Sequence, residues 1–257
     1  NSASATEAEI INCIFDSTST AVSTYAECIT VINNTFNKCG RNTFRVTSEK
    51  RKEGKGFELI NNKFLNSTTG CAIHIWMSFG TNSAISTCPT IRGNIFEHNR
   101  IRNSYEEESN YMFLIRLGQM NTIVFDNNTF RDIQTSKGGF AGKFTSSTNI
   151  VNLTFVNCFF EDHSQTTNGG AFCSSNEYNE GNIYLTFEGC HFNNNEVDGN
   201  GGALFIDTNL DVYISQCKFV SNKASKTSSK DGFSSTIYIS KVQKVTIENC
   251  EFLSNSG

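Results

Sequence analysis

A short phrase that ends in phenylalanine recurs nine times along the chain, and this repeat limits the possible fold more than any other feature. The nine copies end at Phe15, Phe36, Phe64, Phe96, Phe130, Phe160, Phe192, Phe219 and Phe252. Their spacing varies from 21 residues (Phe15 to Phe36) to 34 residues (Phe96 to Phe130), whereas the internal register is constant. A constant unit that carries loops of variable length is typical of a solenoid.

The residues before each phenylalanine form columns of shared character. The residues five and seven positions earlier are apolar, and they alternate with other residues as the inward side chains of a β-strand do. The residue two positions earlier is Asn or Cys, so the inward phase there is shifted by one residue. The shift requires a bend at the third position before the phenylalanine, where eight copies have Asn or Gly, the residues that adopt left-handed backbone most cheaply. Gln216 is the exception, and it predicts local strain or a different corner.

A second phrase follows several of the phenylalanines and precedes a third apolar run. It is clearest at Gly138–Phe140, Gly169–Ala171 and Gly201–Ala203, with degenerate versions at residues 70–73 and 231–233. Three short strands in each turn of roughly 30 residues predict an all-β fold, a right-handed parallel β-helix (solenoid) of about nine coils. We expect residues 1–257 to form a single β-helix domain that is a fragment of a longer chain.

Stacked coils place equivalent residues about 4.8 Å apart, so each column becomes a ladder. We expect stacked core aromatics, with amide hydrogen bonds along the Asn column. The stacked aromatics expected in the later part of the chain are Phe130, Phe160, Phe192, Phe219 and Phe252.

Ten cysteines favour an oxidising compartment. Four share one inward column: Cys158, Cys190, Cys217 and Cys250. Either they are buried free thiols that act as small hydrophobes, which we favour, or they pair between neighbouring coils. Disulfides that close short loops are predicted between Cys28 and Cys39 and between Cys71 and Cys88.

Charge and composition limit the class of protein. A net charge of −4 with one short basic run (Lys50–Lys52) offers no footprint for nucleic acid. No apolar stretch approaches the roughly 18 residues that a membrane span needs. Glycosylation candidates stand in four Asn-x-Ser/Thr sequons, at Asn33, Asn66, Asn127 and Asn152. We therefore expect an extracellular or cell-surface location.

The pairing of a Gly-Gly-Ala-apolar phrase with Phe-x-x-Asn resembles the repeat of the polymorphic outer-membrane protein family. The first phrase stands at residues 169–172 and 201–204, and the second at 96–99, 192–195, 219–222 and 252–255. Members of that family are β-helical surface adhesins, so the resemblance implies adhesion or surface assembly.

Catalysis is the alternative function. Asp132 and Asp162 follow their phenylalanines by two residues, and they could act as paired carboxylates in a polysaccharide lyase or hydrolase or hold Ca²⁺. The neighbouring column of Glu97, Arg131 and Glu161 is typical of a charge-alternating surface ladder, and we favour that interpretation for both columns. No cysteine or histidine spacing indicates a metal, and no cofactor is expected.

We therefore predict a non-enzymatic adhesive or structural protein, with other protein chains or surface glycans as partners. Uncovered end coils would allow end-to-end self-association into a filament. A segment of a large receptor-like chain is a further alternative.

Overall fold

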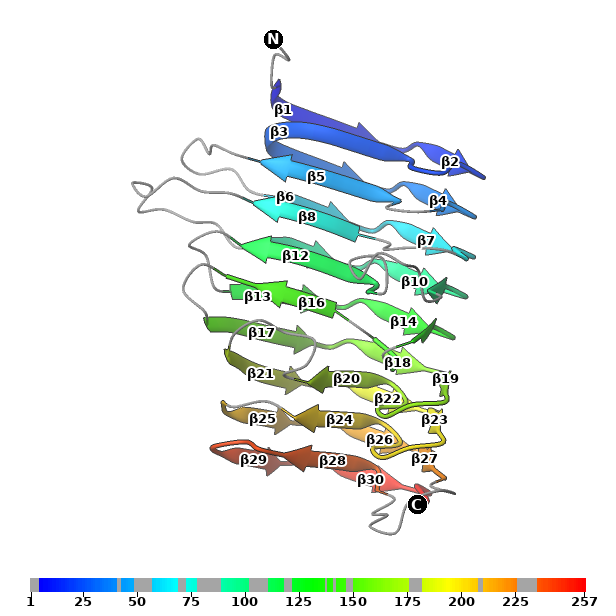
Figure 1. Cartoon of the computed structure of the whole chain (residues 1–257), viewed down its shortest axis with the longest axis vertical. Coiled ribbons are helices and arrows are strands. Elements are labelled where there is room, and N and C mark those ends of the chain that lie inside the picture. Colours follow the sequence, from blue (N-terminus) through cyan, green and yellow to red (C-terminus); the bar gives the residue numbers. More distant parts are fainter. Residues whose placement is uncertain are drawn as a thin grey trace.

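The computed structural model describes residues 5–40, 43–48, 57–68, 73–77, 89–101, 111–117, 122–136, 138–140, 142–146, 150–175, 182–207, 210–225 and 235–257. Every regular element among these residues is a β-strand. The strands stack in parallel along one long axis, from the blue N-terminal end to the red C-terminal end of Figure 1. The prediction of an all-β parallel solenoid is confirmed.

Two long sheets and three short ones surround the core. The large sheet has thirteen strands: β1 (Ala5–Ile11), β3 (Val22–Ile32), β5 (Phe44–Ser48), β6 (Phe57–Ile60), β8 (Ile73–Met77), β9 (Thr90–Arg92), β12 (Phe113–Leu117), β13 (Thr122–Asp126), β16 (Gly142–Thr145), β17 (Ile150–Val156), β21 (Asn182–Glu188), β25 (Val212–Ser215) and β29 (Val245–Glu248). The phenylalanine sheet has nine: β2 (Ile14–Asp16), β4 (Thr35–Asn37), β7 (Lys63–Leu65), β10 (Ile95–Glu97), β14 (Thr129–Arg131), β18 (Phe159–Glu161), β22 (His191–Asn193), β26 (Lys218–Val220) and β30 (Glu251–Leu253). The short sheets contain β11 (Arg100–Ile101) with β15 (Gln134–Thr135); β19 (Ser164–Gln165), β23 (Glu196–Val197) and β27 (Lys223–Ala224); and β20 (Phe172–Ser175), β24 (Leu204–Asp207) and β28 (Ile237–Ser240).

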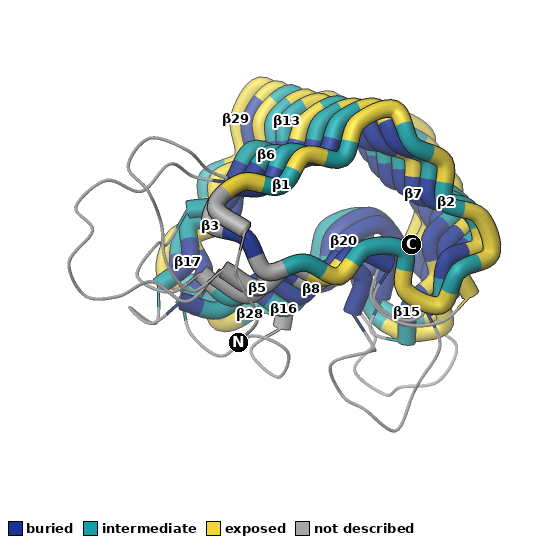
Figure 2. The backbone as a smooth tube through the Cα atoms, turned by 90° about the horizontal axis from the view of Figure 1, so that it is seen from above, coloured by how far each residue is buried: buried dark blue, intermediate teal, exposed yellow. Residues whose placement is uncertain are grey.

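The phenylalanine rings lie in one continuous stack. Each strand of the phenylalanine sheet pairs with the next so that phenylalanine stands beside phenylalanine. Neighbouring ring centroids are 4.7–5.3 Å apart and the planes are within 25° of parallel. Seen along the solenoid, buried positions line the interior (Figure 2). The register therefore follows the sequence columns.

The first corner, three residues before each phenylalanine, is left-handed at every level, where a level is one copy of the repeat. The φ angles lie between 51° and 67°. Gln216 has a φ of 54°, so it makes the same corner as its neighbours, and the alternative of a different corner is wrong. A left-handed residue with a side chain costs about 1–2 kcal/mol more than glycine there. The bend predicted from the phase shift is present.

A second left-handed corner, which was not predicted from the sequence columns, lies two residues after each phenylalanine. Its residues, with φ between 47° and 58°, are Ser17, Lys38, Asn66, His98, Asp132, Asp162, Asn194, Ser221 and Ser254. This corner turns the next side chain inward, which is why Asn99, Asn195 and Asn222 are fully buried. The Phe-x-x-Asn phrase thus records a corner followed by a buried amide.

The Gly-Gly phrase makes a third turn that fits tightly between levels. Gly169 has a φ of 73°. A Cβ atom on Gly170 would overlap the carbonyl oxygen of Gly202 on the next level. The two glycines therefore meet different requirements, one of backbone conformation and one of space.

The predicted number of nine coils stays a prediction. The phenylalanine sheet contributes one strand for each copy of the repeat. However, segments that would close several of the coils, among them residues 49–56, 78–88 and 102–110, lie outside the described residues.

Candidate functional site

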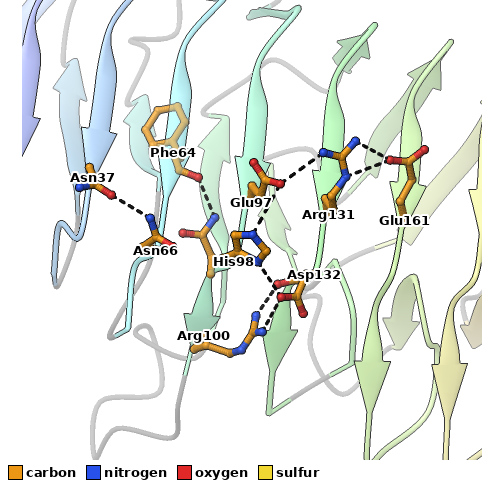
Figure 3. A network of polar contacts seen from close by, with 10 residues as sticks. Asn37, Phe64, Asn66, Glu97, His98, Arg100, Arg131, Asp132 and Glu161 are labelled. Atoms are coloured by element: carbon orange, nitrogen blue, oxygen red, sulfur yellow. Dashed lines mark hydrogen bonds and ion pairs between the residues drawn. The ribbon is translucent and has the colours of Figure 1, made fainter.

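Charged side chains gather around the second corner on neighbouring levels, where β10, β14 and β18 end (Figure 3). Glu97, Arg131 and Glu161 point outward because they follow the inward phenylalanines in their strands, and parallel stacking brings equivalent positions together. These side chains form two linked groups, one centred on Asp132 and one on Arg131.

Two side chains of the preceding level, those of His98 and Arg100, bind the carboxylate of Asp132. Its Oδ2 accepts from Nδ1 of His98 at 2.7 Å and from Nη2 of Arg100 at 2.6 Å, and Arg100 also donates to the Asp132 carbonyl. Partial burial raises the pKa of this carboxyl group, but the hydrogen bonds from Arg100 and His98 outweigh it and lower the pKa overall. Asp132 is therefore a salt-bridged carboxylate.

Arg131 bridges two glutamates on either side of it. Its Nε and Nη2 donate to Oε2 of Glu161 at 3.1 and 2.8 Å, and its Nη1 donates to Oε1 of Glu97 at 3.2 Å. The hydrogen bond to Glu161 is the largest influence that raises the pKa of Arg131, against a smaller effect of burial. The three side chains thus form the charge-alternating ladder that we favoured from the sequence. Exposed pairs of this kind contribute about 0–1 kcal/mol each.

The two aspartates of the enzyme hypothesis are engaged separately. Asp162 accepts through Oδ1 from Nδ2 of Asn194 on the following level at 2.9 Å, whereas Asp132 is bound to the preceding level. A glycosidase acid must keep its proton near neutral pH, and the lowered pKa of Asp132 is opposed to that role. Asp132 is therefore better suited to charge pairing with Arg100 than to proton donation.

Amide side chains extend the same corner toward the N-terminal end. Nδ2 of Asn66 donates to Oδ1 of Asn37 at 2.9 Å, and Nδ2 of Asn37 donates to Asp16 at 2.6 Å. Within the described residues, no group of three or more His, Cys, Asp or Glu side chains could hold a metal ion. The described segments include no helix suited by length and hydropathy to cross a membrane.

The sequon asparagines fall into two classes. Asn33 and Asn127 are exposed residues of the first corner. Asn66 and Asn152 are half-buried, and Asn152 donates to Thr122 Oγ1 at 3.4 Å. The first two asparagines are thus the better-placed acceptors for a glycan.

The four column cysteines are thiols that donate hydrogen bonds to the preceding level. Cys158, Cys190 and Cys217 are buried and free. Their sulfurs lie 3.3–3.6 Å from backbone carbonyl oxygens of the large sheet, such as those of Phe125 and Phe155. In the earlier levels, asparagine amides donate to the equivalent carbonyls, for example Asn128 to Ile91 at 2.8 Å. A thiol therefore replaces an amide in the same column.

The predicted Cys28–Cys39 disulfide is wrong. Cys39 is a free thiol after the second corner, 3.4 Å from Thr18 Oγ1 and 3.6 Å from the Phe15 carbonyl. Cys28 lies in β3 of the large sheet, on a different side of the coil. The short sequence separation misled the prediction because two corners intervene. Cys71 and Cys88 lie outside the described residues.

A buried histidine was missed because its column was not recognised. His163 follows Phe160 by three residues and occupies the inward column after the second corner, where it is 1% exposed. Its Nδ1 lies 2.8 Å from Oδ1 of Asn195, and its Nε2 has no hydrogen-bond partner. Burial lowers the pKa of His163 to about 4, so the ring is neutral at physiological pH. The Phe-x-x-Asn register is the signal that would have located it.

No family model, no curated protein and no solved structure matches this chain.

Proposed function

We propose that the protein is a non-enzymatic adhesive or structural β-helix that acts outside the cell or on the cell surface. The observation that carries this proposal is the mutual pairing of the polar corner groups. Asp132, Arg131 and Asp162 each bind side chains of a neighbouring level. Such ladders stabilise a rigid rod and leave its regular outer surfaces for other protein chains or glycans.

Nine right-handed coils are the finer form of the fold that we propose. One strand per level in the phenylalanine sheet supports the number. The general right-handedness of parallel β-crossovers, about 98% of cases, supports the hand. A rod of this kind displays long, continuous faces to a partner.

Direct binding tests the adhesive role. Fluorescently labelled protein is applied to a glycan array and to cultured cells, and we expect saturable binding that unlabelled protein competes away. The same assay on a variant with its lateral tyrosines removed, Tyr184→Ser with Tyr213→Ser, locates the bound face, since both rings are exposed on the large sheet. Absence of binding to every glycan and cell type would count against adhesion.

Turnover of polysaccharides tests the alternative. The protein is incubated with neutral and acidic polysaccharides, and new reducing ends and unsaturated products are measured. We expect none. Sustained turnover that is lost in Asp132→Asn with Asp162→Asn, but kept in the control Asp126→Asn, would replace the proposal with an enzyme.

Secretion tests the location. Expressed through a eukaryotic secretory pathway, the chain is expected to carry glycans at Asn33 and Asn127, the exposed sequons. Peptide mass spectrometry before and after glycan removal measures their occupancy. Retention inside the cell in aggregated form would contradict an extracellular role.

A further inference from the structure

Two tyrosine side chains are exposed on the outer face of the large sheet, on the neighbouring strands β21 and β25 (Figure 1). Tyr184 is 39% exposed and Tyr213 is 38% exposed. Strand β17 precedes β21 in the sheet and β29 follows β25, so the exposure of the two rings does not depend on the ends of the rod. Tyrosine is enriched at protein interfaces because its ring is apolar and its hydroxyl group is polar.

The register of the strands brings the two rings close together. Tyr213 pairs with Thr186, and Tyr184 stands two residues before Thr186 on β21. The tyrosines are therefore diagonal neighbours on one face of the sheet. The strand spacing and the rise per residue place their Cα atoms about 8 Å apart, a distance that aromatic side chains can bridge. The two rings thus form one aromatic surface across two levels.

The ring of Tyr213 lies along its strand instead of standing away from the sheet. Its hydroxyl group donates a hydrogen bond to Oε1 of Glu248 on the following level. Ser215, two residues after Tyr213 on β25, is the register partner of Glu248. By strand alternation Ser215 points outward like Tyr213, yet it is only 4% exposed. The ring therefore covers Ser215 and turns its other face to the solvent.

Two glutamates flank the hydroxyl end of Tyr213. Glu188 and Glu248 are the register partners of Ser215 on the preceding and following levels, and both are exposed. The hydrogen bond to Glu248 is the largest cause of a raised pKa of Tyr213, and the charge of Glu188 adds to it. The hydroxyl group therefore stays protonated at physiological pH, and both carboxylates lie at the border of the aromatic surface.

The surrounding charges show what kind of partner fits. Asp211 stands beside Tyr184 in the register of β21 and β25, and Lys244 stands beside Asp211 on the following level. We define the tyrosine face as the surface formed by Tyr184, Glu188, Asp211, Tyr213, Lys244 and Glu248. With three carboxylates against one ammonium group, the tyrosine face is acidic. It is thus complementary to a cationic partner and repels an acidic one.

We propose that the tyrosine face binds an arginine- or lysine-rich segment of another protein. This inference rests on the adhesive role proposed above and names the chemistry of the partner. The face of a tyrosine ring attracts a guanidinium or ammonium group, and the neighbouring carboxylates accept its hydrogen bonds. In an extended segment, alternate side chains point to one side about 7 Å apart, so two cations on that side can reach both Tyr184 and Tyr213.

Peptide binding tests the tyrosine face directly. The probe is a fluorescent peptide in which arginine alternates with glycine. The control peptide has citrulline in place of arginine, which removes the charge and keeps the shape of the side chain. Fluorescence anisotropy should show saturable binding of the arginine peptide, weakened by added salt, and no binding of the citrulline peptide. A wild-type protein that does not bind the arginine peptide at physiological salt would overturn the inference.

Two double variants test the role of the rings. Tyr184→Leu with Tyr213→Leu should weaken peptide binding roughly tenfold, because the aromatic faces are lost. Tyr184→Phe with Tyr213→Phe should bind within about threefold of the wild type, because the phenyl rings still attract cations. Thermal unfolding shows that each variant is folded. If the leucine variant binds as tightly as the wild type, the rings take no part and the proposal is wrong.

A matched pair of charge variants tests the role of the carboxylates. Glu188→Gln with Asp211→Asn should weaken peptide binding roughly fivefold. The control Glu97→Gln with Glu161→Gln removes the same charge from the phenylalanine sheet and should bind like the wild type. Equal losses in the two variants would mean that the peptide responds only to the net charge of the protein, which would refute a defined site.

The adhesion assay on the leucine variant separates this inference from the proposed function. Cell binding that persists in this variant keeps the adhesive role and assigns it to another surface. Peptide binding by a wild type that binds no cells keeps the tyrosine face and removes adhesion. Binding of a neutral glycan that the leucine variant loses, without binding of the arginine peptide, would assign the face to saccharides and exclude the basic partner.

Discussion

At the scale of single residues, the buried asparagine column bonds the levels to one another. Asn94 illustrates its geometry: Oδ1 accepts from the backbone N and from Nδ2 of Asn62, while Nδ2 donates to the Leu59 carbonyl and to Asn128. Each amide thus satisfies groups on both neighbouring levels. Removing one leaves buried donors and an acceptor without partners.

Asn94→Ala should lower the free energy of unfolding by about 3 kcal/mol, since several buried polar groups lose their partners. Asn94→Cys should cost less, because thiols donate to the equivalent carbonyls in the later levels. Urea unfolding followed by circular dichroism measures both values. Equal losses in the two variants would show that the column acts by packing alone.

His163 makes stability depend on pH. Its folded pKa is about 4, below the ordinary value of 6.5, so the unfolded chain binds the proton more tightly. The neutral ring of His163 makes its full contribution to the free energy of unfolding above pH 6.5. This contribution, about 3 kcal/mol, is lost as the pH falls toward 4. Asp132 and Asp162 favour the charged ring, and Arg100 opposes it.

His163→Asn should flatten this dependence, because an amide fits a column that continues as Asn195 and Asn222. Urea unfolding at pH 4.5 and at pH 7.5 gives the difference for each protein. If the variant loses as much stability on acidification as the wild type, another group carries the effect.

At the scale of elements, the turns tolerate substitution less well than the strands do. Gly170→Ala should destabilise the protein by about 3 kcal/mol or more, because the added Cβ would meet the Gly202 backbone and cannot move aside. Thr154→Ala, on a half-buried position of β17, is the matched control and should change stability little. Thermal unfolding compares the two. A tolerated Gly170→Ala would mean that neighbouring levels separate easily.

The strand–corner–strand unit could be predicted because the alternation of inward and outward side chains gives a recognisable pattern of apolar residues in the sequence. The inward phase of the side chains shifts by one residue before Phe130 and its counterparts, and only a bend in the backbone explains this shift. Before Phe130, the left-handed Asn127 forms the bend. The second corner was missed because its residues, such as Lys38 and His98, have no shared chemistry. Their conformation is imposed by the levels above and below.

At the scale of the whole molecule, stability should depend on position along the rod. Phe130 is fully buried between two rings, while Phe252 is 48% exposed and has one neighbour in the stack. Phe130→Ala should cost about 3–5 kcal/mol, and Phe252→Ala a fraction of that. Urea unfolding of both variants measures the contrast. Equal costs would argue for a uniform, fully cooperative core instead of a sum over neighbouring levels.

The sequence by itself determined the solenoid and the register of its rings, because a residue repeated at a constant place in a stacked unit can only fall on its own column. The tertiary structure alone decided which polar groups meet. Asp132 joins His98 and Arg100 from the preceding level, and Asp162 joins Asn194 from the following one. These partners lie 32–34 residues apart along the chain. Their approach depends on where each corner turns the backbone, which one chain segment does not encode in isolation.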